Sequence, residues 1–232
     1  MSRVIELHWF RFSSDKDGLY PDLSLLSPEE VKQFDGFENR QAASDFALRR
    51  SFRRRVLGDQ LNIPPGQIRF KNNDAGKPAL IAGQNAVRFN TSHGRYGGVL
   101  ALCEAFPVGV DIEFFRPIDE AAFADKILSP RERATHFALQ AEVQLASLFA
   151  IWTAKEAVIK ALGIGLNLNQ LPLIDVDPQE RHSSWRDVRI SPPLPQADWK
   201  IWTQRLDDAF GVPAIVSIAA PEACEVVIRE AD

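Results

Sequence analysis

Two acidic side chains on one apolar stretch are the first residues of this chain that could do chemistry. The stretch is PVGVDIEFF, residues 107–115. Side chains alternate across a β-strand, so Asp111 and Glu113 would share one face, opposite Ile112. An ordinary half-exposed strand with an acidic outer face shows the same alternation. On this stretch alone, a functional pair of acids and a solvated pair both stay open.

A second candidate is a long apolar helix that carries an acid and a base. In LASLFAIWTAKEAVIKALGIG, residues 145–165, the side chains of Trp152, Glu156 and Lys160 step by four and form one stripe. Charged groups within so apolar a helix cost free energy unless each is paired or bound to an ion. The alternative is an exposed Glu–Lys salt bridge, which contributes only about 0.3–0.5 kcal/mol.

Two polar turns complete the candidate chemistry. The segment Asn90-Thr91-Ser92-His93-Gly94 separates two strand-like stretches, and NDAGKPAL, residues 73–80, contains a Gly-Lys-Pro loop with Lys77. His93 alone could be a structural histidine, and Lys77 alone could be a solvated turn residue. Together with three carboxylates, however, these groups predict a site for Mg²⁺ and phosphate oxygens. Phosphoryl chemistry depends mainly on such positioning and neutralisation of charge.

Positive charge is concentrated in one segment of an otherwise acidic chain. The formal net charge is −4, yet residues 40–55, RQAASDFALRRSFRRR, contain six arginines and one aspartate. The negative net charge argues against an overall positive electrostatic potential that would attract nucleic acid. The arginine patch therefore indicates a specific anionic partner, a solvated helix face, or both.

The elements that must position these residues occur in two similar series. SPEEVKQF (27–34) and SPRERATHF (129–137) both read as capping-box helix starts, and a long helix follows each. Each half also begins and ends with an apolar strand. The pattern predicts an α+β fold of two similar subdomains, 1–105 and 106–232, each a small, mostly antiparallel sheet packed on a long helix. Chance similarity of helix starts remains the alternative.

The bulk composition indicates a soluble globular protein. The chain has 232 residues, of which 45% are hydrophobic and 25% charged. No apolar segment approaches the roughly 20 residues that cross a bilayer. The start MSRVIELHWFRF reads as a strand and not as a secretion signal, and Cys103 and Cys224 show no metal-ligand spacing. These features predict a cytoplasmic protein with reduced thiols.

Four motifs in a fixed order resemble a known family. The order GKP, FNTSH, GVDIE and WTAKEAVIK is similar to that of the Sfp-type 4′-phosphopantetheinyl transferases. The family signature, (V/I)-G-(V/I)-D-(I/V/L)-E followed by W-(S/T)-x-K-E-(A/S)-x-x-K, is matched at every fixed place by residues 108–113 and 152–160. The resemblance covers the chain from about Arg40 to Leu168. It implies a pair of α+β subdomains related by a pseudo-twofold axis. A chain of this length further implies a monomer of broad specificity.

The resemblance also implies a reaction and a set of residues. Phosphopantetheine would pass from coenzyme A to a serine of an apo acyl or peptidyl carrier protein, releasing 3′,5′-ADP. The implied Mg²⁺ ligands are Asp111, Glu113 and Glu156. The implied coenzyme A contacts are Lys77, Ser92, His93, Lys155, Lys160 and, for the 3′-phosphate, Arg40, Arg50 and Arg54. The implied catalytic residues are Glu156, Lys160 and Glu132, with the general base left open between the two glutamates.

Three other functions remain as alternatives. A Mg²⁺-dependent phosphohydrolase or nuclease would explain the acids and the lysine, but not the Gly-Lys-Pro and Asn-x-Ser-His elements. A nucleic-acid-binding module would use the arginine patch, against the overall acidity of the chain. A catalytically weak family member would retain the motifs for another role.

Overall fold

The computed structural model describes residues 3–12, 21–84, 87–176 and 184–230. Its strands are β1 (Val4–Arg11), β2 (Phe70–Asn72), β3 (Pro78–Leu80), β4 (Arg88–His93), β5 (Gly97–Cys103), β6 (Gly109–Phe114), β7 (Ile174–Asp175), β8 (Arg186–Ile190), β9 (Trp199–Arg205), β10 (Ala214–Ala220) and β11 (Glu225–Glu230). Its α-helices are α1 (Pro28–Asp35), α2 (Arg40–Leu61), α3 (Glu120–Ile127), α4 (Pro130–Phe137), α5 (Ala141–Leu162) and α6 (Asp207–Phe210). Short 3₁₀ turns are η1 (Leu23–Leu25), η2 (Pro65–Gln67) and η3 (Leu168–Leu173).

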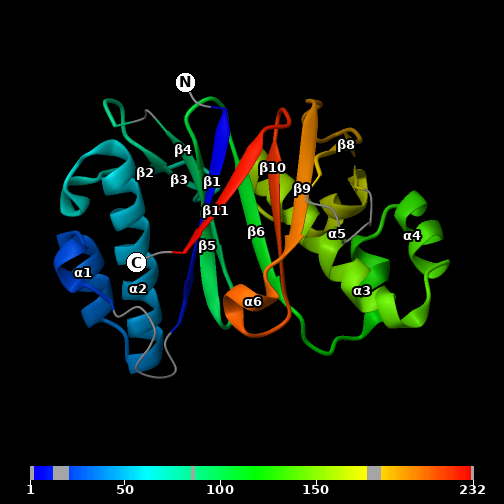
Figure 1. Ribbon diagram of the computed structural model, residues 1–232, viewed down its shortest axis with the longest axis horizontal. Coiled ribbons are helices and arrows are strands. Elements are labelled where there is room, and N and C mark those ends of the chain that lie inside the picture. Colours follow the sequence, from blue (N-terminus) through cyan, green and yellow to red (C-terminus); the bar gives the residue numbers. More distant parts are fainter. Residues whose placement is uncertain (1–2, 13–20, 85–86, 177–183, 231–232) are drawn as a thin grey trace.

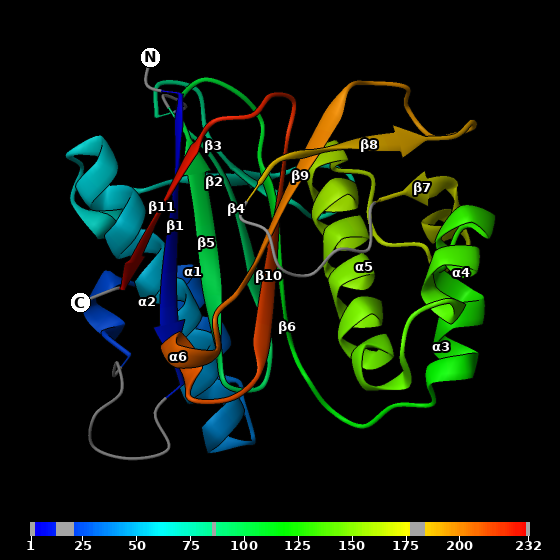
Figure 2. The same ribbon diagram turned by 45° about the vertical axis from the view of Figure 1, so that its right-hand side comes forward.

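The molecule is layered, with two sheets between two groups of helices (Figure 1). One sheet has the strand order β11-β1-β5-β4 and the other β6-β10-β9-β8-β7. Apolar side chains from both sheets form one shared core, which includes Leu7, Val99, Ile112 and Val216. Helix α2 packs on the outer face of the first sheet and α5 on the outer face of the second. The turned view shows α3 and α4 beyond α5 (Figure 2).

The two helix starts read from the sequence are confirmed as capping boxes. Ser27 Oγ accepts from the backbone N–H of Glu30, whose carboxylate accepts from the N–H of Ser27. Ser129 and Glu132 make the same pair of bonds at the start of α4. Each box satisfies two N–H groups that the first helical turn leaves without partners.

The order of elements repeats between the halves and confirms the α+β class. In the first half, β5 pairs antiparallel with both β1 and β4. In the second half, β10 pairs antiparallel with both β6 and β9, so the strand orders β1-β5-β4 and β6-β10-β9 correspond. In each half a capping-box helix precedes a helix of 22 residues. A twofold relation between the halves stays a prediction, as does the boundary at residue 105. One strand of the second half, β11, belongs to the sheet of the first half, because it pairs parallel with β1.

Helix α5 lies directly on β6, and a glycine permits this close approach. A Cβ atom built on Gly109 would stand 2.0 Å from the carbonyl oxygen of Ala157 and 2.5 Å from the backbone nitrogen of Ala161. Only glycine fits at this point without moving the helix. The helix ends at Gly163, whose φ of 71° is the left-handed conformation of a C-terminal cap. Asp111 therefore lies on a strand that is fixed against the helix carrying Glu156.

Among the described residues, no helix has the length and apolar character needed to cross a membrane.

Candidate active site

The candidate site lies where the edge strands β4 and β6 of the two sheets meet. The Asn90 side chain on β4 joins them, because its Oδ1 accepts from the backbone N–H of Val110 at 2.8 Å. Two residues further along β4 and one further along β6, Ser92 Oγ donates to Asp111 Oδ1 at 2.7 Å. This seam brings residues from both halves of the sequence to the same point, beside the C-terminal part of α5.

Asp111 is a buried carboxylate with one oxygen left over. Its residue is 3% exposed, and Oδ1 accepts from both Ser92 Oγ and Lys160 Nζ. Oδ2 is buried with no hydrogen-bond partner among the described residues. Burial raises the pKa of this carboxyl, against the opposing effect of the Lys160 ammonium. A buried carboxylate oxygen without a partner is costly and calls for a ligand.

Lys160 and Glu156 complete a charge cluster around Asp111. The Lys160 amine lies 2.5 Å from Asp111 Oδ1, 3.0 Å from Ser92 Oγ and 3.6 Å from Glu156 Oε2. Burial works to lower the pKa of Lys160, but Asp111 and Glu156 outweigh it and the pKa is raised. Burial and the charges of Asp111 and Glu113 raise the pKa of Glu156 to about 7. The helical stripe read from the sequence thus faces the acidic strand, and the lysine stays protonated.

Glu113 is held on both sides by other side chains. Its Oε1 accepts from the indole Nε1–H of Trp152 at 2.9 Å, and its Oε2 accepts from Arg116 at 2.7 Å. Trp152 belongs to the same α5 stripe as Glu156. The indole therefore fixes the rotamer of Glu113, while Arg116 supplies a countercharge from the solvent side.

These groups have the chemistry of a Mg²⁺ site, although the acids are not gathered as ligands. In the part of the chain that the structure describes, no three His, Cys, Asp or Glu side chains are grouped to hold a metal ion. The reason is visible in the contacts, since the Lys160 ammonium stands between Asp111 and Glu156. The oxygen donors and the unpartnered Oδ2 of Asp111 nevertheless fit a hard cation.

A cleft opens on this cluster. It has a volume of about 240 Å³ and is lined on one side by the loop with Lys77 and on the other by Glu156, Lys160 and Leu166. The Lys77 amine donates to the backbone carbonyl oxygens of Lys160 at 2.6 Å and Val108 at 3.4 Å. Burial lowers its pKa to about 8. Lys77 is thus at the cleft as expected, but its amine binds backbone carbonyl oxygens of α5 and of the residue before β6 and so ties the loop to both.

A basic pocket adjoins the cleft on the α2 side. Its volume is about 190 Å³, and its polar lining includes Arg49, Arg50, Arg53, Ser92 and His93. His93 keeps an exposed surface, yet desolvation and the positive charges of Arg49, Lys160 and Arg50 lower its pKa to about 4. A neutral imidazole can donate one hydrogen bond there while guanidinium groups hold an anion. A wider groove of about 740 Å³ continues from this pocket along Arg50, Arg53 and Phe70.

Two of the three arginines expected from the sequence do not belong to this pocket. Arg54 is buried and donates to Glu30 Oε2 at 2.6 Å and to the carbonyl oxygens of Pro65 and Ile68. These bonds engage its guanidinium inside the first half, although Arg54 also lines the wider groove, and its contact with coenzyme A stays a prediction. Arg40 is exposed at the first turn of α2, outside the pocket. Of the three, only Arg50 lines the pocket.

Lys155 and Glu132 also lie away from the cleft, in a closed ion pair. The Lys155 amine is fully buried and donates to Glu132 Oε2 at 2.5 Å and to the carbonyl oxygens of Ile127 and Leu171. Glu132 accepts further bonds from the backbone N–H groups of Ser129 and Val176. The geometry gives both residues a structural role and does not support Glu132 as a base or Lys155 as a ligand contact.

Sequence reasoning overlooked three residues that the structure brings to the site. Arg49 and Arg53 line the basic pocket, and Arg116 binds Glu113. The spacing of Arg49 and Arg53 by four residues was the available signal, because such residues share one helix face. No local pattern distinguishes Arg116, whose role depends on the turn that follows β6.

Comparison with known proteins decides the family. The family model for the 4′-phosphopantetheinyl transferase superfamily matches residues 107–216. The 4′-phosphopantetheinyl transferase HetI of Nostoc sp. (strain PCC 7120) is 31% identical over 166 residues, which cover 69% of this chain and 70% of HetI. The chain belongs to the 4′-phosphopantetheinyl transferase superfamily.

Two other members of the superfamily match over a shorter part than HetI does. The 4′-phosphopantetheinyl transferase psf-1 of Bacillus pumilus is 36% identical over 148 residues, 60% of this chain and 62% of psf-1. The 4′-phosphopantetheinyl transferase Sfp of Bacillus subtilis (strain 168) is 31% identical over 147 residues, 63% of this chain and 64% of Sfp. The alignments with psf-1 and Sfp thus span less than two thirds of those relatives. The superfamily match includes β6 and α5, the two elements that carry the acids of the site.

Proposed function

We propose that this protein transfers the 4′-phosphopantetheine group from coenzyme A to a serine of an apo acyl or peptidyl carrier protein, with Mg²⁺, releasing 3′,5′-ADP. The observation that carries the proposal is the pairing of two neighbouring sites. The acid-and-lysine cluster of Asp111, Glu156 and Lys160 adjoins the basic pocket of Arg49, Arg50, Arg53 and His93. A substrate with a pyrophosphate and a separate phosphate requires such an arrangement.

The basic pocket would bind the phosphate on the ribose of coenzyme A. Guanidinium groups bind phosphate bidentately and stay charged, and Arg49 and Arg50 are half-buried there beside His93. The burial of Arg53 lowers its pKa to about 9, so it is still cationic near neutral pH. The arginines would also attract an acidic carrier protein toward the cleft.

The cleft residues would then accept the proton of the serine hydroxyl and stabilise the negative charge that develops on the leaving group. Glu156 lines the cleft beside Lys160 and would accept the proton of the incoming serine hydroxyl. Lys160 keeps its proton and would stabilise negative charge on the leaving pyrophosphate oxygen. Ser92 orients both Lys160 and Asp111 through its hydroxyl.

Asp111, Glu113 and Glu156 would hold the Mg²⁺ ion, which when bound neutralises phosphate charge and polarises the phosphoryl group. The unpartnered Oδ2 of Asp111 supports this assignment. Trp152 would keep Glu113 directed at the ion, as neighbouring groups do for metal ligands in general.

The test is transfer itself. The protein is incubated with coenzyme A, Mg²⁺ and a panel of apo carrier proteins from fatty-acid, polyketide and peptide synthesis, and each carrier is weighed by mass spectrometry. A gain of one phosphopantetheine group on a carrier serine, lost when Mg²⁺ is chelated, is the expected result. Release of free phosphate without that gain would instead favour a phosphohydrolase. Binding of nucleic acid that is salt-dependent and insensitive to Mg²⁺ would favour a binding module.

A further inference from the structure

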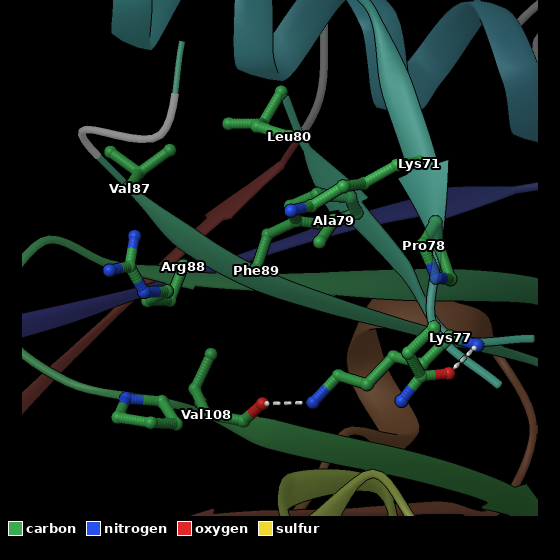
Figure 3. Close-up of a pocket in the computed structure, with 11 residues that line it drawn as sticks. Lys71, Lys77, Pro78, Ala79, Leu80, Val87, Arg88, Phe89 and Val108 are labelled. Carbon is green, nitrogen blue, oxygen red and sulfur yellow. Dashed lines mark hydrogen bonds between the residues drawn. The ribbon is translucent and has the colours of Figure 1, made fainter. Parts of the chain in front are cut away.

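A second cavity lies at the other end of β4 from the active cleft (Figure 3). Its volume is about 320 Å³, which is the room of about ten water molecules in the liquid. The volume falls at the small end of the range for ligand pockets, about 300–1,000 Å³. Its lining comes from the β2–β3 hairpin, the start of β4 and the segment before β6: Lys71, Asn73, Lys77, Pro78, Ala79, Leu80, Val87, Arg88, Phe89, Pro107 and Val108.

This cavity is separate from the proposed coenzyme A site. It touches β4 at Arg88 and Phe89, whereas the active cleft and the basic pocket touch the same strand from Asn90 to His93. The Lys77 side chain lines both the cavity and the cleft and lies between them. Apart from Lys77, which is also an expected coenzyme A contact, no residue that lines this cavity has a part in the proposed transfer reaction.

The wall of the cavity is apolar. Leu80, Val87, Phe89 and Val108 are buried side chains or nearly so, each 5% exposed or less. In Figure 3 the side chains of Leu80, Val87 and Ala79 stand around the opening between β3 and β4. An apolar group placed there would gain about 25 cal/mol for each Å² of apolar surface removed from water.

The charged groups of the lining all have the same sign. Lys71, Lys77 and Arg88 line the cavity, and no acidic residue is among the lining residues. A pocket with cations and a low-dielectric wall concentrates anions. Lys77 adds a particular reason, since its ammonium is half-buried and burial lowers its pKa to about 8. Its contact with the Val108 carbonyl is long, at 3.4 Å, so a stronger acceptor can compete for that proton.

We propose that this cavity binds a small monoanion with a short apolar tail, of the class of medium-chain carboxylates. The carboxylate meets Lys77, Lys71 adds positive charge from the hairpin, and the tail lies against Leu80, Phe89 and Val108. A cation of the same shape is repelled by the lining, and a neutral molecule gains only the apolar contacts. The proposal does not depend on the transferase activity.

The test compares three probes with the same tail. Octanoate, octanol and octylammonium are titrated into the isotope-labelled protein and followed by amide chemical shifts. Saturable shifts at Ala79, Phe89 and Val108 with octanoate are expected, with affinity at least about tenfold weaker for octanol and no saturation with octylammonium, because one charge-assisted contact contributes about 1.5–3 kcal/mol. Equal affinity for the three probes would overturn the proposal.

Variants locate the probe. Ala79→Phe fills the cavity from an exposed position of β3 and is expected to weaken octanoate binding at least tenfold. The matched control is Ala82→Phe, an exposed alanine in the next turn that does not line the cavity. Lys71→Glu, also exposed, reverses one charge and should weaken octanoate binding even if Ala79→Phe alters the hairpin. Arg49→Gln removes a cation of the basic pocket and should leave binding unchanged. Unchanged affinity in Ala79→Phe and Lys71→Glu, or loss in Arg49→Gln, would refute the site.

Discussion

At the residue scale, two lysines of α5 show that the side of the helix from which a side chain leaves determines its role. Lys155 and Lys160 are five residues apart on one helix, so their side chains leave it on different sides. Lys155 points into a closed cluster and pairs with Glu132, while Lys160 points into the seam and pairs with Asp111. Lys155 is a cation beside one carboxylate, whereas Lys160 lies between two, those of Asp111 and Glu156. Of Glu132 and Asp111, only Asp111 has a carboxylate oxygen without a hydrogen-bond partner among the described residues.

Replacing each lysine by methionine should separate stability from catalysis. Lys155→Met leaves the Glu132 carboxylate buried without its cation, and we expect the free energy of unfolding to fall by about 3–5 kcal/mol. Lys160→Met should cost less stability, because the Lys160 side chain is partly exposed at the cleft whereas Lys155 is fully buried, but it should lower kcat about 10²–10³-fold. Urea unfolding and the carrier-modification assay measure the two effects. Equal loss of stability in both variants would contradict the assignment of Lys160.

Asp111→Asn tests the unpartnered carboxylate oxygen. The amide keeps the shape of the side chain and removes a charge whose burial is unfavourable, so the fold should persist with unchanged thermal stability. Transfer should fall at least about 10²-fold, because the buried negative charge that would hold the cation is lost. The control is Asp187→Asn, since Asp187 also pairs with a lysine, Lys200, but is exposed on β8. Wild-type kcat/KM in Asp111→Asn would remove this residue from the site.

At the element scale, the distance between β6 and α5 determines the geometry of the acids. Gly109→Ala places a methyl group against the Ala157 carbonyl, and overpacking of this kind costs about 1–3 kcal/mol. We expect a matching fall in the free energy of unfolding and a larger fall in kcat, because Asp111 follows two residues later. Gly66→Ala is the control, since a Cβ there meets nothing within 4 Å. If the Gly109 variant kept its wild-type kcat, close contact of strand and helix would not matter to the site.

The α1–α2 pair depends on one carboxylate. Glu30 accepts from Arg53 and Arg54 as well as from its capping partner Ser27. Burial acts to raise the pKa of Glu30, but the Ser27 N–H and the two arginines prevail and lower it. The folded state thus binds its proton less readily than the unfolded state, and this contribution to stability is present above the ordinary pKa of 4.5 and is lost as the pH falls below it.

Glu30→Gln should therefore destabilise the protein in a pH-dependent way. At about pH 7 we expect a loss of about 3 kcal/mol, as for a broken buried ion pair. The difference from wild type should narrow as the pH falls below 4.5, because Glu30 is protonated first in the unfolded state and, at lower pH, in the folded state. Urea titrations at several pH values measure it, with Glu29→Gln on the exposed side of α1 as the control. If the difference in free energy of unfolding between wild type and Glu30→Gln increased as the pH fell, the assigned role of the Glu30 carboxylate would be wrong.

Much of this arrangement was accessible from the sequence, and the remainder depends on tertiary contacts. The alternation of Asp111 and Glu113, the stripe of Glu156 and Lys160, and both capping boxes are local patterns, and the structure confirms the elements that they predict. The direction of Lys155 was not accessible, because an apolar helix offers core on more than one side. Arg54 could not be separated from its arginine neighbours until η2 and α1 supplied its acceptors.

At the scale of the whole molecule, the site exists only because the two halves share an interior. The first sheet and the second contribute to one apolar core, and Ser92 of one half reaches Asp111 of the other. The strand β11 returns from the C-terminal half to pair with β1. A parallel edge strand of half-exposed residues gives no sequence signal of the sheet that it joins. The chain therefore divides into two series of elements, each with an apolar cluster around its own long helix, and the two series share a further core between the sheets.

Fragments 1–105 and 106–232 test this unity. Each alone exposes its face of the shared core, and the first also lacks β11, so we expect neither to unfold cooperatively or to transfer phosphopantetheine. Coexpression should restore both properties in part, because the contacts that join the halves are packing and hydrogen bonds and not a connecting loop. Circular dichroism with urea and the carrier assay follow the two properties, with the intact chain as reference. Cooperative unfolding of either isolated fragment would mean that the halves are autonomous domains, and the seam between β4 and β6 would then be a docking surface between them.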